Sequence, residues 1–295
     1  MGRIAQGRVR QTAVRSYTRR VPEPSLLLLI PAYNEEARIE PVLREVAGYF
    51  QAQYPAPARI LVVLNGCRDN TLGVVQRVAK EFPLIEWQDH PAPIGKGGAL
   101  IEGLKVARDA ELIGYVDADG ATPPRAFHAL ARMTDRADMV IGSRWLPGAT
   151  LHRAQTPLRR FTSRCFHLIV ESLFWMHIKD TQCPAKVMRR RVVETILPHL
   201  QIADLAFDVN LIVSAHRAGF KVLEVPTEWT DIGGSKVTAS LFRSSLTMFL
   251  STVRLRLMYS PFRRCLGWFS PAERWLYDKL RAPHRPSDEA SAPRN

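Results

Sequence analysis

The chain has 295 residues, of which 46% are hydrophobic and 23% charged, so it is long enough to bury one sizeable core. Its net charge of +13 divides into +5 over residues 1–24, +7 over 241–285 and only +2 over 25–240, with −1 in the last ten residues. Charge at the two ends indicates an anionic partner, either a membrane or a nucleic acid. The near-neutral central region has no recognised nucleic-acid-binding module, so we expect no nucleic-acid partner.

Four cysteines lie far apart without a C-x-x-C pair, which indicates neither a zinc site nor a disulfide framework and fits a reducing, cytoplasmic setting. The N-terminus lacks the apolar segment of a secretory signal, and no stretch approaches eighteen uninterrupted apolar residues. We therefore expect no transmembrane helix. The basic segment 1–24 and the polar tail 283–295 are expected to be disordered.

Short apolar runs alternate with helical patterns from residue 25 to about 142. The expected strands are 26–30, 60–64, 84–87, 112–116 and 139–142, with another at 222–225. The expected helices are 39–50, 72–79, 99–107, 158–178, 207–218 and 241–259. Asn34 and Asp69 are predicted N-caps of the first two helices. This alternation predicts an α/β fold, a mostly parallel sheet with flanking helices, whose ligands bind at the carboxyl ends of the strands.

The sharpest local motif is Y-V-D-A-D-G over residues 115–120, in which an apolar strand ends in two carboxylates. Because a strand alternates its faces, Asp117 and Asp119 are expected to start on the same face. Oxygen ligands of this kind suit Mg²⁺ or Mn²⁺, which hold substrate phosphates while keeping several waters. Taken alone, the motif fits equally well two solvated acids in a loop.

Two further motifs follow strands. In I-P-A-Y-N-E-E (30–36), a kinked strand end with an aromatic ring and an amide offers a place for a nucleobase, and it also fits a simple strand-to-helix turn. G-K-G-G (95–98) precedes a helix but lacks the spacing of a P-loop or of G-x-G-x-x-G. Backbone amides at a helix start, together with Lys96, are nevertheless suited to a diphosphate.

These motifs, followed by G-S-R (142–144), D-T-Q-C (180–183) and G-S-K (234–236), together resemble the family 2 glycosyltransferases of GT-A fold. Within that family the chain is most similar to the polyprenyl-phosphate sugar synthases, and D-A-D-G-A-T, D-T-Q-C and F-D-V (207–209) to the dolichyl-phosphate β-glucosyltransferase branch. The resemblance implies a GT-A domain over 25–237, followed by amphipathic helices over 238–282.

The resemblance also implies roles on the nucleotide side of the site. Pro31, Tyr33 and Glu35 would lie around the base and ribose. Asp117 would contact the ribose or a metal-bound water, and Asp119 would be the direct ligand of Mg²⁺ or Mn²⁺.

On the sugar side, Arg144 would face the acceptor phosphate or the donor diphosphate. Asp180 and Gln182 would line the sugar and the acceptor, and Ser235 and Lys236 would contact the diphosphate. Arg144, Asp180 and Gln182 are therefore the expected catalytic residues.

Two departures from the family pattern leave questions open. Leu64-Asn65-Gly66-Cys67 stands where the family usually has paired acids and Gly-Ser, and an Asp at that place commonly reads uracil. Asn65 is still expected to bind the nucleotide, but the base of the donor stays open. Pro184-Ala185 replaces the usual Gly-Phe after the Q-C pair, so the shape of the acceptor pocket stays open too.

The implied reaction moves a sugar, with glucose favoured, from a nucleotide-diphosphate sugar to a dolichyl or undecaprenyl phosphate, with inversion. The acceptor is already anionic at neutral pH, so the enzyme mainly positions it and stabilises charge on the leaving diphosphate. GDP-mannose as donor, or a soluble or polysaccharide acceptor, is the alternative within the same fold. A more remote alternative, suggested by charge alone, is a non-enzymatic basic nucleic-acid-binding protein.

The C-terminal segment bears on the choice of acceptor. Within residues 241–259 apolar side chains recur at helical spacing, namely Phe242, Leu246, Phe249, Leu250, Val253 and Leu257. Arg243, Arg254 and Arg256 flank this stripe. An apolar stripe edged with arginines predicts a helix in the bilayer interface, and hence a peripheral enzyme on the cytoplasmic face of a membrane. The alternative is a helix packed on the enzyme's own core with its arginines in solvent.

Overall fold

The computed structural model describes residues 23–107, 109–152, 157–204, 206–232 and 241–260. Its elements in chain order are β1 (Leu26–Ala32), α1 (Ile39–Gln53), β2 (Ala58–Asn65), α2 (Thr71–Glu81), β3 (Ile85–His90), α3 (Gly95–Lys105), β4 (Leu112–Tyr115), α4 (Pro124–Arg132), η1 (Met133–Asp135), β5 (Met139–Ser143), β6 (Thr150–Leu151), α5 (Pro157–Phe174), β7 (Lys186–Arg189), α6 (Arg190–Ile196), η2 (Leu197–His199), α7 (Phe207–Arg217), β8 (Val222–Pro226), β9 (Glu228–Trp229) and α8 (Leu241–Met258).

The central sheet has the order β3-β2-β1-β4-β7-β5-β8. All its pairings are parallel except those of β7, which runs antiparallel to β4 and β5. The mostly parallel sheet and each of the six strands expected from apolar runs are thereby confirmed. The sequence did not predict β7, a four-residue strand that begins with a lysine. A small second sheet pairs β6 with β9.

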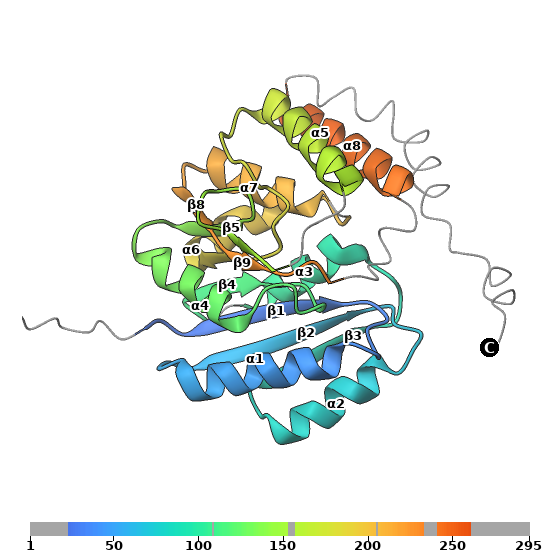
Figure 1. Cartoon of the computed structure of the whole chain (residues 1–295), viewed down its shortest axis with the longest axis vertical. Coiled ribbons are helices and arrows are strands. Elements are labelled where there is room, and N and C mark those ends of the chain that lie inside the picture. The colour runs from blue at the N-terminus through green and yellow to red at the C-terminus, as the bar shows by residue number, and fades with distance from the viewer. Residues whose placement is uncertain (1–22, 108, 153–156, 205, 233–240, 261–295) are drawn as a thin grey trace, which may run out of the picture.

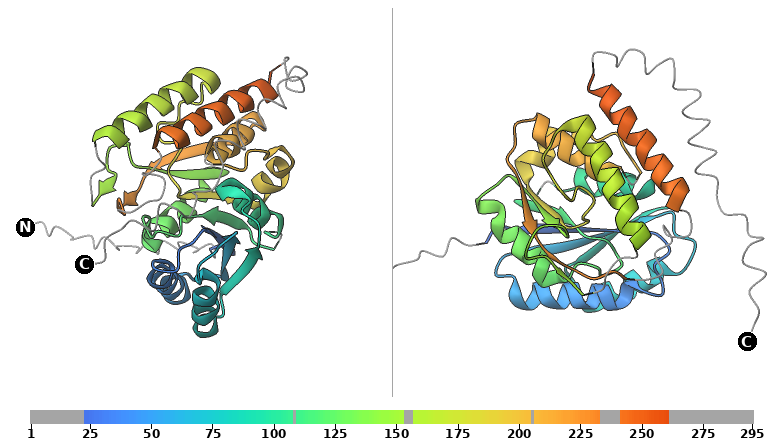
Figure 2. Two further views of the ribbon diagram at one scale, coloured as in Figure 1. Left: turned by 90° about the vertical axis from the view of Figure 1, so that its right-hand side faces the viewer. Right: turned by 45° about the horizontal axis from the view of Figure 1, so that its top comes forward.

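Helices cover both faces of the sheet (Figure 1). Along β1, Leu26, Leu28 and Ile30 join the core under α1, α2 and α4, while Leu27 and Leu29 join the core under α3, α6 and α7. A strand buried on both faces needs an unbroken apolar run, which explains the L-L-L-L-I sequence. Helices α5 and α8 lie side by side as an outer layer beyond α7 (Figures 1 and 2).

Two of the predicted helix boundaries are wrong. α3 begins at Gly95, four residues before the expected start, and α5 ends at Phe174, four residues before the expected end. Trp175 and His177 have positive φ angles of 53° and 56°, a backbone conformation that a right-handed helix cannot continue through. Helices α4 and α6 were not expected, although Pro at the first turn of α4 is a typical helix-start residue.

The predicted N-caps are also wrong, because α1 begins after Arg38 and α2 after Asn70. Asn34, with φ of 53°, instead accepts a hydrogen bond from the Arg68 backbone N–H at 2.7 Å. Asp69 accepts one from the Glu36 backbone N–H at 3.1 Å. These side chains therefore tie the β1–α1 loop to the β2–α2 loop at the carboxyl edge of the sheet.

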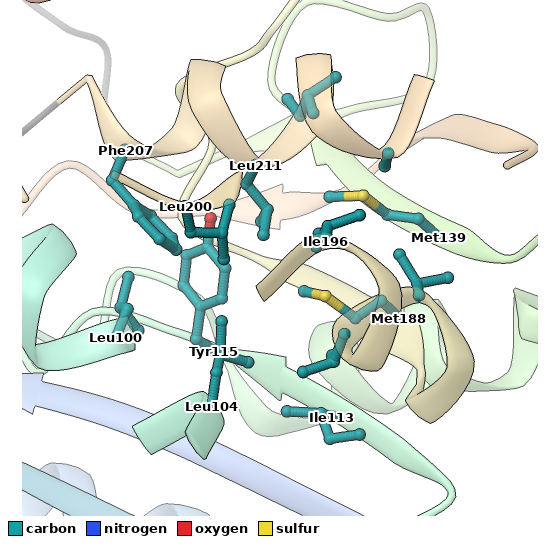
Figure 3. Close-up of a cluster of buried hydrophobic side chains, with 14 of the residues drawn as sticks. Leu100, Leu104, Ile113, Tyr115, Met139, Met188, Ile196, Leu200, Phe207 and Leu211 are labelled. Atoms are coloured by element: carbon teal, nitrogen blue, oxygen red, sulfur yellow. The ribbon is translucent and has the colours of Figure 1, made fainter. Parts of the chain in front are cut away.

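The larger core surrounds the end of β4. Tyr115 lies among Leu100, Leu104, Leu200 and Phe207, so its ring is fully enclosed (Figure 3). Among the described helices, none is both long and apolar enough to cross a membrane.

Candidate active site

The expected site residues gather at one edge of the sheet. Asn65 ends β2, Asp117 follows β4, and Arg144 follows β5, all at carboxyl ends of parallel strands. Because β7 is antiparallel, the segment 180–183 that precedes it reaches the same edge. The sequence motifs therefore converge as predicted, and Ser235 and Lys236 lie outside the described residues.

The two acidic residues lie in a loop beyond β4, which ends at Tyr115, so the expected placement of both on one face of a strand is wrong. Asp117 Oδ1 forms an ion pair with Lys96 Nζ at 2.6 Å. Asp119 Oδ1 accepts a hydrogen bond from the Ala121 backbone N–H at 2.9 Å. Burial and the neighbouring charge of Asp117 raise the pKa of Asp119 above its ordinary value.

Asp117 and Asp119 suit a divalent cation that binds together with a diphosphate. The described residues hold no group of three or more His, Cys, Asp or Glu side chains that would bind a metal unaided. Magnesium commonly uses one or two carboxylates and takes its other ligands from water and substrate phosphates. Asp117 and Asp119 are close enough for one charge to raise the pKa of the other, and a cation between them would relieve that repulsion.

Lys96 supplies a positive charge next to Asp117. Burial acts to lower its pKa, but the carboxylates of Asp117 and Asp208 outweigh burial and raise the pKa. Lys96 is therefore charged at neutral pH, which suits a group expected to contact a diphosphate.

The glycines around Lys96 serve packing more than phosphate binding. A Cβ at Gly95 would lie 2.3 Å from the Ala203 carbonyl oxygen, and one at Gly97 would lie 2.7 Å from the Ile202 carbonyl oxygen. The Gly98 N–H donates to Ala203 O at 3.1 Å. The expectation that the amides of this helix start meet a diphosphate is therefore wrong for Gly98, and the same holds for Gly95.

The Gly95 backbone N–H is hydrogen-bonded to the side chain of Asn65. Its Oδ1 accepts hydrogen bonds from the backbone N–H groups of Ile94, at 2.6 Å, and Gly95, at 3.0 Å. The side chain thus holds the start of α3 in place. Its remaining polar group, Nδ2, is a hydrogen-bond donor, whereas an aspartate would present an acceptor there.

Arg144 and Asp180 form a buried, bidentate ion pair. Arg144 Nε lies 2.7 Å from Asp180 Oδ2 and Nη2 lies 2.8 Å from Oδ1, while the Arg144 backbone N–H also donates to Oδ2. Burial acts to raise the pKa of Asp180, but Arg144 outweighs burial and holds the pKa below its ordinary value. The guanidinium also stacks on Trp229, 5.1 Å from the ring centroid. The positive charge of Arg144 is therefore already neutralised by a carboxylate of the protein, that of Asp180.

A second buried network, not expected from the sequence, lies beneath the site. Lys186 is fully buried, and its Nζ donates to Asp208 Oδ1 and, at 2.6 Å, to Cys183 O. The Tyr115 hydroxyl donates to the same Asp208 oxygen. Burial acts to raise the pKa of Asp208, but Lys186 and Lys96 lower it. The lysine inside the apolar P-A-K-V-M run is the sequence signal from which a buried carboxylate partner can be inferred, and the sequence analysis did not use it.

The residues expected around the nucleotide lie at the end of β1. Pro31 is within the strand, and Tyr33, just beyond it, is 43% exposed. The Glu35 carboxylate accepts from Arg38 at 2.8 and 2.9 Å, and its backbone N–H donates to Thr71 Oγ1. Tyr33 therefore offers an accessible ring at the edge where Asp117 and Lys96 meet.

Comparison with known proteins matches residues 28–197 to the model of glycosyl transferase family 2. A dolichyl-phosphate β-glucosyltransferase of Trichomonas vaginalis is 36% identical over 223 residues, which cover 72% of this chain and 66% of that protein. The enzyme of that name from Dictyostelium discoideum is 30% identical, over 79% of this chain and 74% of its own length. The chain thus spans about two thirds to three quarters of the length of these relatives.

Solved structures show the same fold at low identity. Glucosyl-3-phosphoglycerate synthase of Mycobacterium tuberculosis superposes with a TM-score of 0.59 at 15% identity, covering 79% of this chain and 80% of that one. That synthase was crystallised with Mg²⁺ and UDP, and with Mn²⁺, UDP and glucosyl-3-phosphoglycerate. With the sheet, the acidic pair and these matches in agreement, the chain belongs to glycosyl transferase family 2, as a GT-A-type glycosyltransferase that resembles the dolichyl-phosphate β-glucosyltransferases.

Proposed function

We propose that this chain transfers glucose from a nucleotide-diphosphate glucose to a polyprenyl phosphate. The relatives that carry the name dolichyl-phosphate β-glucosyltransferase support the sugar and the acceptor class. The main observation that supports a nucleotide-diphosphate donor is the Lys96–Asp117 ion pair beside Asp119. It places a cation and two carboxylates at the carboxyl edge of the sheet.

The transfer is a single displacement with inversion. A phosphate oxygen of the acceptor forms a bond to the anomeric carbon while the bond from that carbon to the diphosphate oxygen breaks, and the nucleoside diphosphate leaves with the electron pair. A phosphate monoester is ionised at neutral pH, so no side chain needs to remove a proton. The protein's task is to align the two phosphates and to stabilise the charge that develops on the leaving group.

Asp117 and Asp119 would hold Mg²⁺ or Mn²⁺, which supplies Lewis-acid stabilisation of the diphosphate. Lys96 would turn from Asp117 to the diphosphate when the donor binds, because the incoming phosphates compete for its charge. Tyr33 would stack on the base, and the start of α3, held by Asn65, would keep Lys96 in place.

A panel of nucleotide sugars with Mg²⁺ or Mn²⁺ and a polyprenyl phosphate tests this function. The expected product is a glucosylated lipid phosphate formed only when metal is present. Transfer to a soluble acceptor in preference to the lipid phosphate would overturn the acceptor assignment, and transfer from GDP-mannose in preference to a glucose donor would overturn the sugar.

We further propose that α5 and α8 form the face that meets the membrane. The α8 side turned toward the protein is small and polar at Ser251 and Thr252, both buried, and Ser251 donates a hydrogen bond to Asp204. Phe249, from the predicted apolar stripe, is 39% exposed instead. On the neighbouring helix Leu168 is 65% exposed, and Trp175, just after it, is 69% exposed. Leu255 of α8 and Val170 of α5 also pack into the core, but the large apolar side chains left exposed on and next to these two helices favour a bilayer as partner.

Cations accompany these exposed side chains. Arg217 and Arg256 line a cavity of about 210 Å³ between the ends of α5, α7 and α8, together with Trp175 and Tyr259. Among described residues, neither arginine has a carboxylate within ion-pair distance. Arginines without a carboxylate partner near the exposed Trp175 ring suit anionic lipid headgroups, as on the cytoplasmic leaflet.

Co-sedimentation with phosphatidylcholine vesicles, with and without phosphatidylglycerol, tests this face. Trp175→Ser with Phe249→Ser is expected to reduce binding to both vesicles, and Arg217→Gln with Arg256→Gln only to the anionic ones. Trp87→Ser, at an exposed ring on β3, and Arg136→Gln, on a distant loop, are the matched controls. Equal binding by all variants would contradict the assignment.

A further inference from the structure

Four buried polar groups near the Arg144–Asp180 pair have no hydrogen-bond partner. They are Thr122 Oγ1, Gln182 Nε2, Thr227 Oγ1 and Trp229 Nε1. The described part of the chain holds only three other such atoms, Gln88 Oε1, His90 Nε2 and His167 Nδ1. Burying a polar group without a partner is costly, so a cluster of them needs an explanation.

The four groups come from segments that contact one another. The Thr230 N–H donates to Ala121 O at 2.8 Å, which places Trp229 and Thr122 on either side of one hydrogen bond. The Thr227 N–H donates to Ser143 O at 3.1 Å, next to Arg144.

Gly142 joins the remaining segment to these. A Cβ on Gly142 would lie 3.1 Å from a Thr227 methyl carbon and 3.2 Å from the Cys183 sulfur, so Thr227 and the residue after Gln182 flank the same glycine. The Trp229 ring lies under the Arg144 guanidinium. The ends of β4 and β5, the segment before β7 and the β8–β9 connection therefore meet at one place, on the sugar side of the site.

The chemistry of the set selects its ligand. Two groups, the indole N–H and the amide NH₂, only donate, and two hydroxyls both donate and accept. The four groups are themselves uncharged, and the charge of Arg144, whose guanidinium lies over the Trp229 ring, is neutralised by Asp180. All four groups could donate to a phosphate, but a phosphate would bring a negative charge for which this set holds no unpaired cation and would leave the lone pairs of the two hydroxyls unused, whereas sugar hydroxyls both accept and donate.

We propose that Thr122, Gln182, Thr227 and Trp229 form the subsite that binds the hydroxyl groups of the donor hexose. Protein contacts position the indole ring, since the Arg144 guanidinium lies over it and Asp180 holds Arg144. Sites built to hydrogen-bond a hydroxyl discriminate strongly against sugars that lack it, because the protein group is then left buried and unpaired. These residues would therefore set the choice of sugar.

Substitutions that remove one polar group each test this assignment. Trp229→Phe removes the indole N–H and keeps an aromatic ring, and Thr227→Val and Thr122→Val remove a hydroxyl at nearly constant volume. Trp87→Phe and Thr134→Val are matched controls, at an exposed ring on β3 and at a buried hydroxyl in η1 that already donates to Ala131 O.

Because this inference rests on the proposed glucosyl transfer, the experiment measures binding as well as turnover. Calorimetry with UDP and UDP-glucose gives the difference in affinity that is due to the hexose, called here the hexose increment. If the panel of nucleotide sugars shows a guanosine donor, GDP and GDP-glucose are compared instead. Each site variant is expected to reduce that increment by roughly three- to tenfold, the range for one neutral hydrogen bond, without changing the affinity for the nucleotide alone.

Deoxyglucose donors then identify the partner hydroxyl. For each site variant, one deoxy donor should bind the variant and the unsubstituted protein equally well, because the same hydrogen bond is absent from both. Thermal unfolding is a second readout. In Thr227→Val and Thr122→Val, removal of a buried unpaired hydroxyl is expected to leave the unfolding temperature unchanged or higher, whereas loss of a structural contact would lower it.

A hexose increment unchanged in all three variants would overturn the subsite. So would a loss confined to a water-soluble isoprenyl phosphate, because the ligand would then be the acceptor phosphate. If glucose donors bind with the expected hexose increment but no lipid product forms, the polyprenyl-phosphate acceptor is wrong and the hexose subsite is still supported.

Discussion

Arg144 and Asp180, thirty-six residues apart in the chain, form a bidentate pair in which both side chains are nearly buried. The pair joins the end of β5 to the segment that leads into β7. Asp180 is held in turn, since its backbone N–H and that of Lys179 donate to Glu224 at 2.8 and 3.0 Å. The G-S-R and D-T-Q-C motifs are thus one structural unit, and its position decides where Gln182 and Trp229 lie.

Asp180→Asn is expected to destabilise the protein by about 3–5 kcal/mol, because it leaves the Arg144 charge buried without its partner. Chemical denaturation at pH 7 measures the change. Glu81→Gln, which breaks an exposed pair with Arg44, is the control and should cost much less, because surface ion pairs contribute little to stability. If both variants lost the same free energy of unfolding, burial would not be the reason why the Arg144–Asp180 pair matters for stability.

The buried Lys186–Asp208 pair makes stability depend on pH. Lys186 and Lys96 keep the pKa of Asp208 below its ordinary value, so the pair stabilises the fold above the unfolded pKa, about 3.9, and this contribution is lost as the pH falls through the lower folded pKa. In Lys186→Met one of the two cations is gone and burial remains, which raises the pKa of Asp208. The variant's deficit should therefore be largest at pH 7 and shrink on acidification toward pH 5.

Urea denaturation of both proteins at pH 7 and pH 5 checks this sign. In Lys186→Met/Asp208→Asn no titrating group is left in the pair, so its deficit should not change between the two pH values. A deficit of Lys186→Met that is equal at pH 7 and pH 5 would contradict the electrostatic account.

The sequence predicted the sheet well because strands buried on both faces need unbroken apolar runs. The run 26–30 leaves no helical alternative, whereas β7, with lysine and arginine at its ends, carries no such pattern. Its antiparallel insertion between β4 and β5 depends on long-range pairing, which periodicity does not encode. The Lys186–Asp208 contact shares this property, since it joins residues on different elements.

The site was predictable as motifs and less so as contacts. Asp117 and Asp119 were recognised, but the partner of Asp117 is Lys96, from a motif that was assigned only to phosphate. Trp229, in the short strand β9, and Thr227, just before it, went unnoticed because a single tryptophan and a single threonine look like ordinary core residues. Only the missing hydrogen-bond partners of their buried atoms set them apart.

Asp119→Asn is expected to abolish metal-dependent binding of the donor, since it removes the charge that a hard divalent cation needs. Calorimetric titration with UDP-glucose at varied Mg²⁺ or Mn²⁺ measures the loss. Asp135→Asn, at an exposed position in η1, is the control for the charge change. Metal-dependent affinity that survives in Asp119→Asn would remove this residue from the metal site.

Lys96→Met is expected to weaken diphosphate binding by roughly ten- to a hundredfold, the range for one charge-assisted hydrogen bond. The nucleoside monophosphate should lose less, because it lacks the second phosphate that Lys96 is proposed to meet. Titrations with UMP and UDP, or GMP and GDP, compare the two losses. Equal losses for both ligands would place Lys96 away from the diphosphate.

Asn65→Asp separates the structural role of this residue from its role toward the base. The Oδ1 atom that accepts from Ile94 and Gly95 is retained, and a carboxylate at the start of α3 interacts favourably with the helix dipole. The unfolding temperature should therefore be unchanged or slightly higher. What changes is the outer atom, which becomes a hydrogen-bond acceptor in place of the Nδ2 donor.

An acceptor at this position suits a base that presents an N–H group, such as the N3–H of uracil. Asn65→Asp is therefore expected to raise the affinity for UDP relative to CDP, whose N3 is itself an acceptor, by roughly tenfold or more, the range for a hydrogen bond to a charged group. Calorimetry with both nucleotides measures the ratio, and Asn70→Asp adds the same charge in the neighbouring loop as a control. A ratio that does not change would show that Asn65 only holds the start of α3, and that the base is read elsewhere.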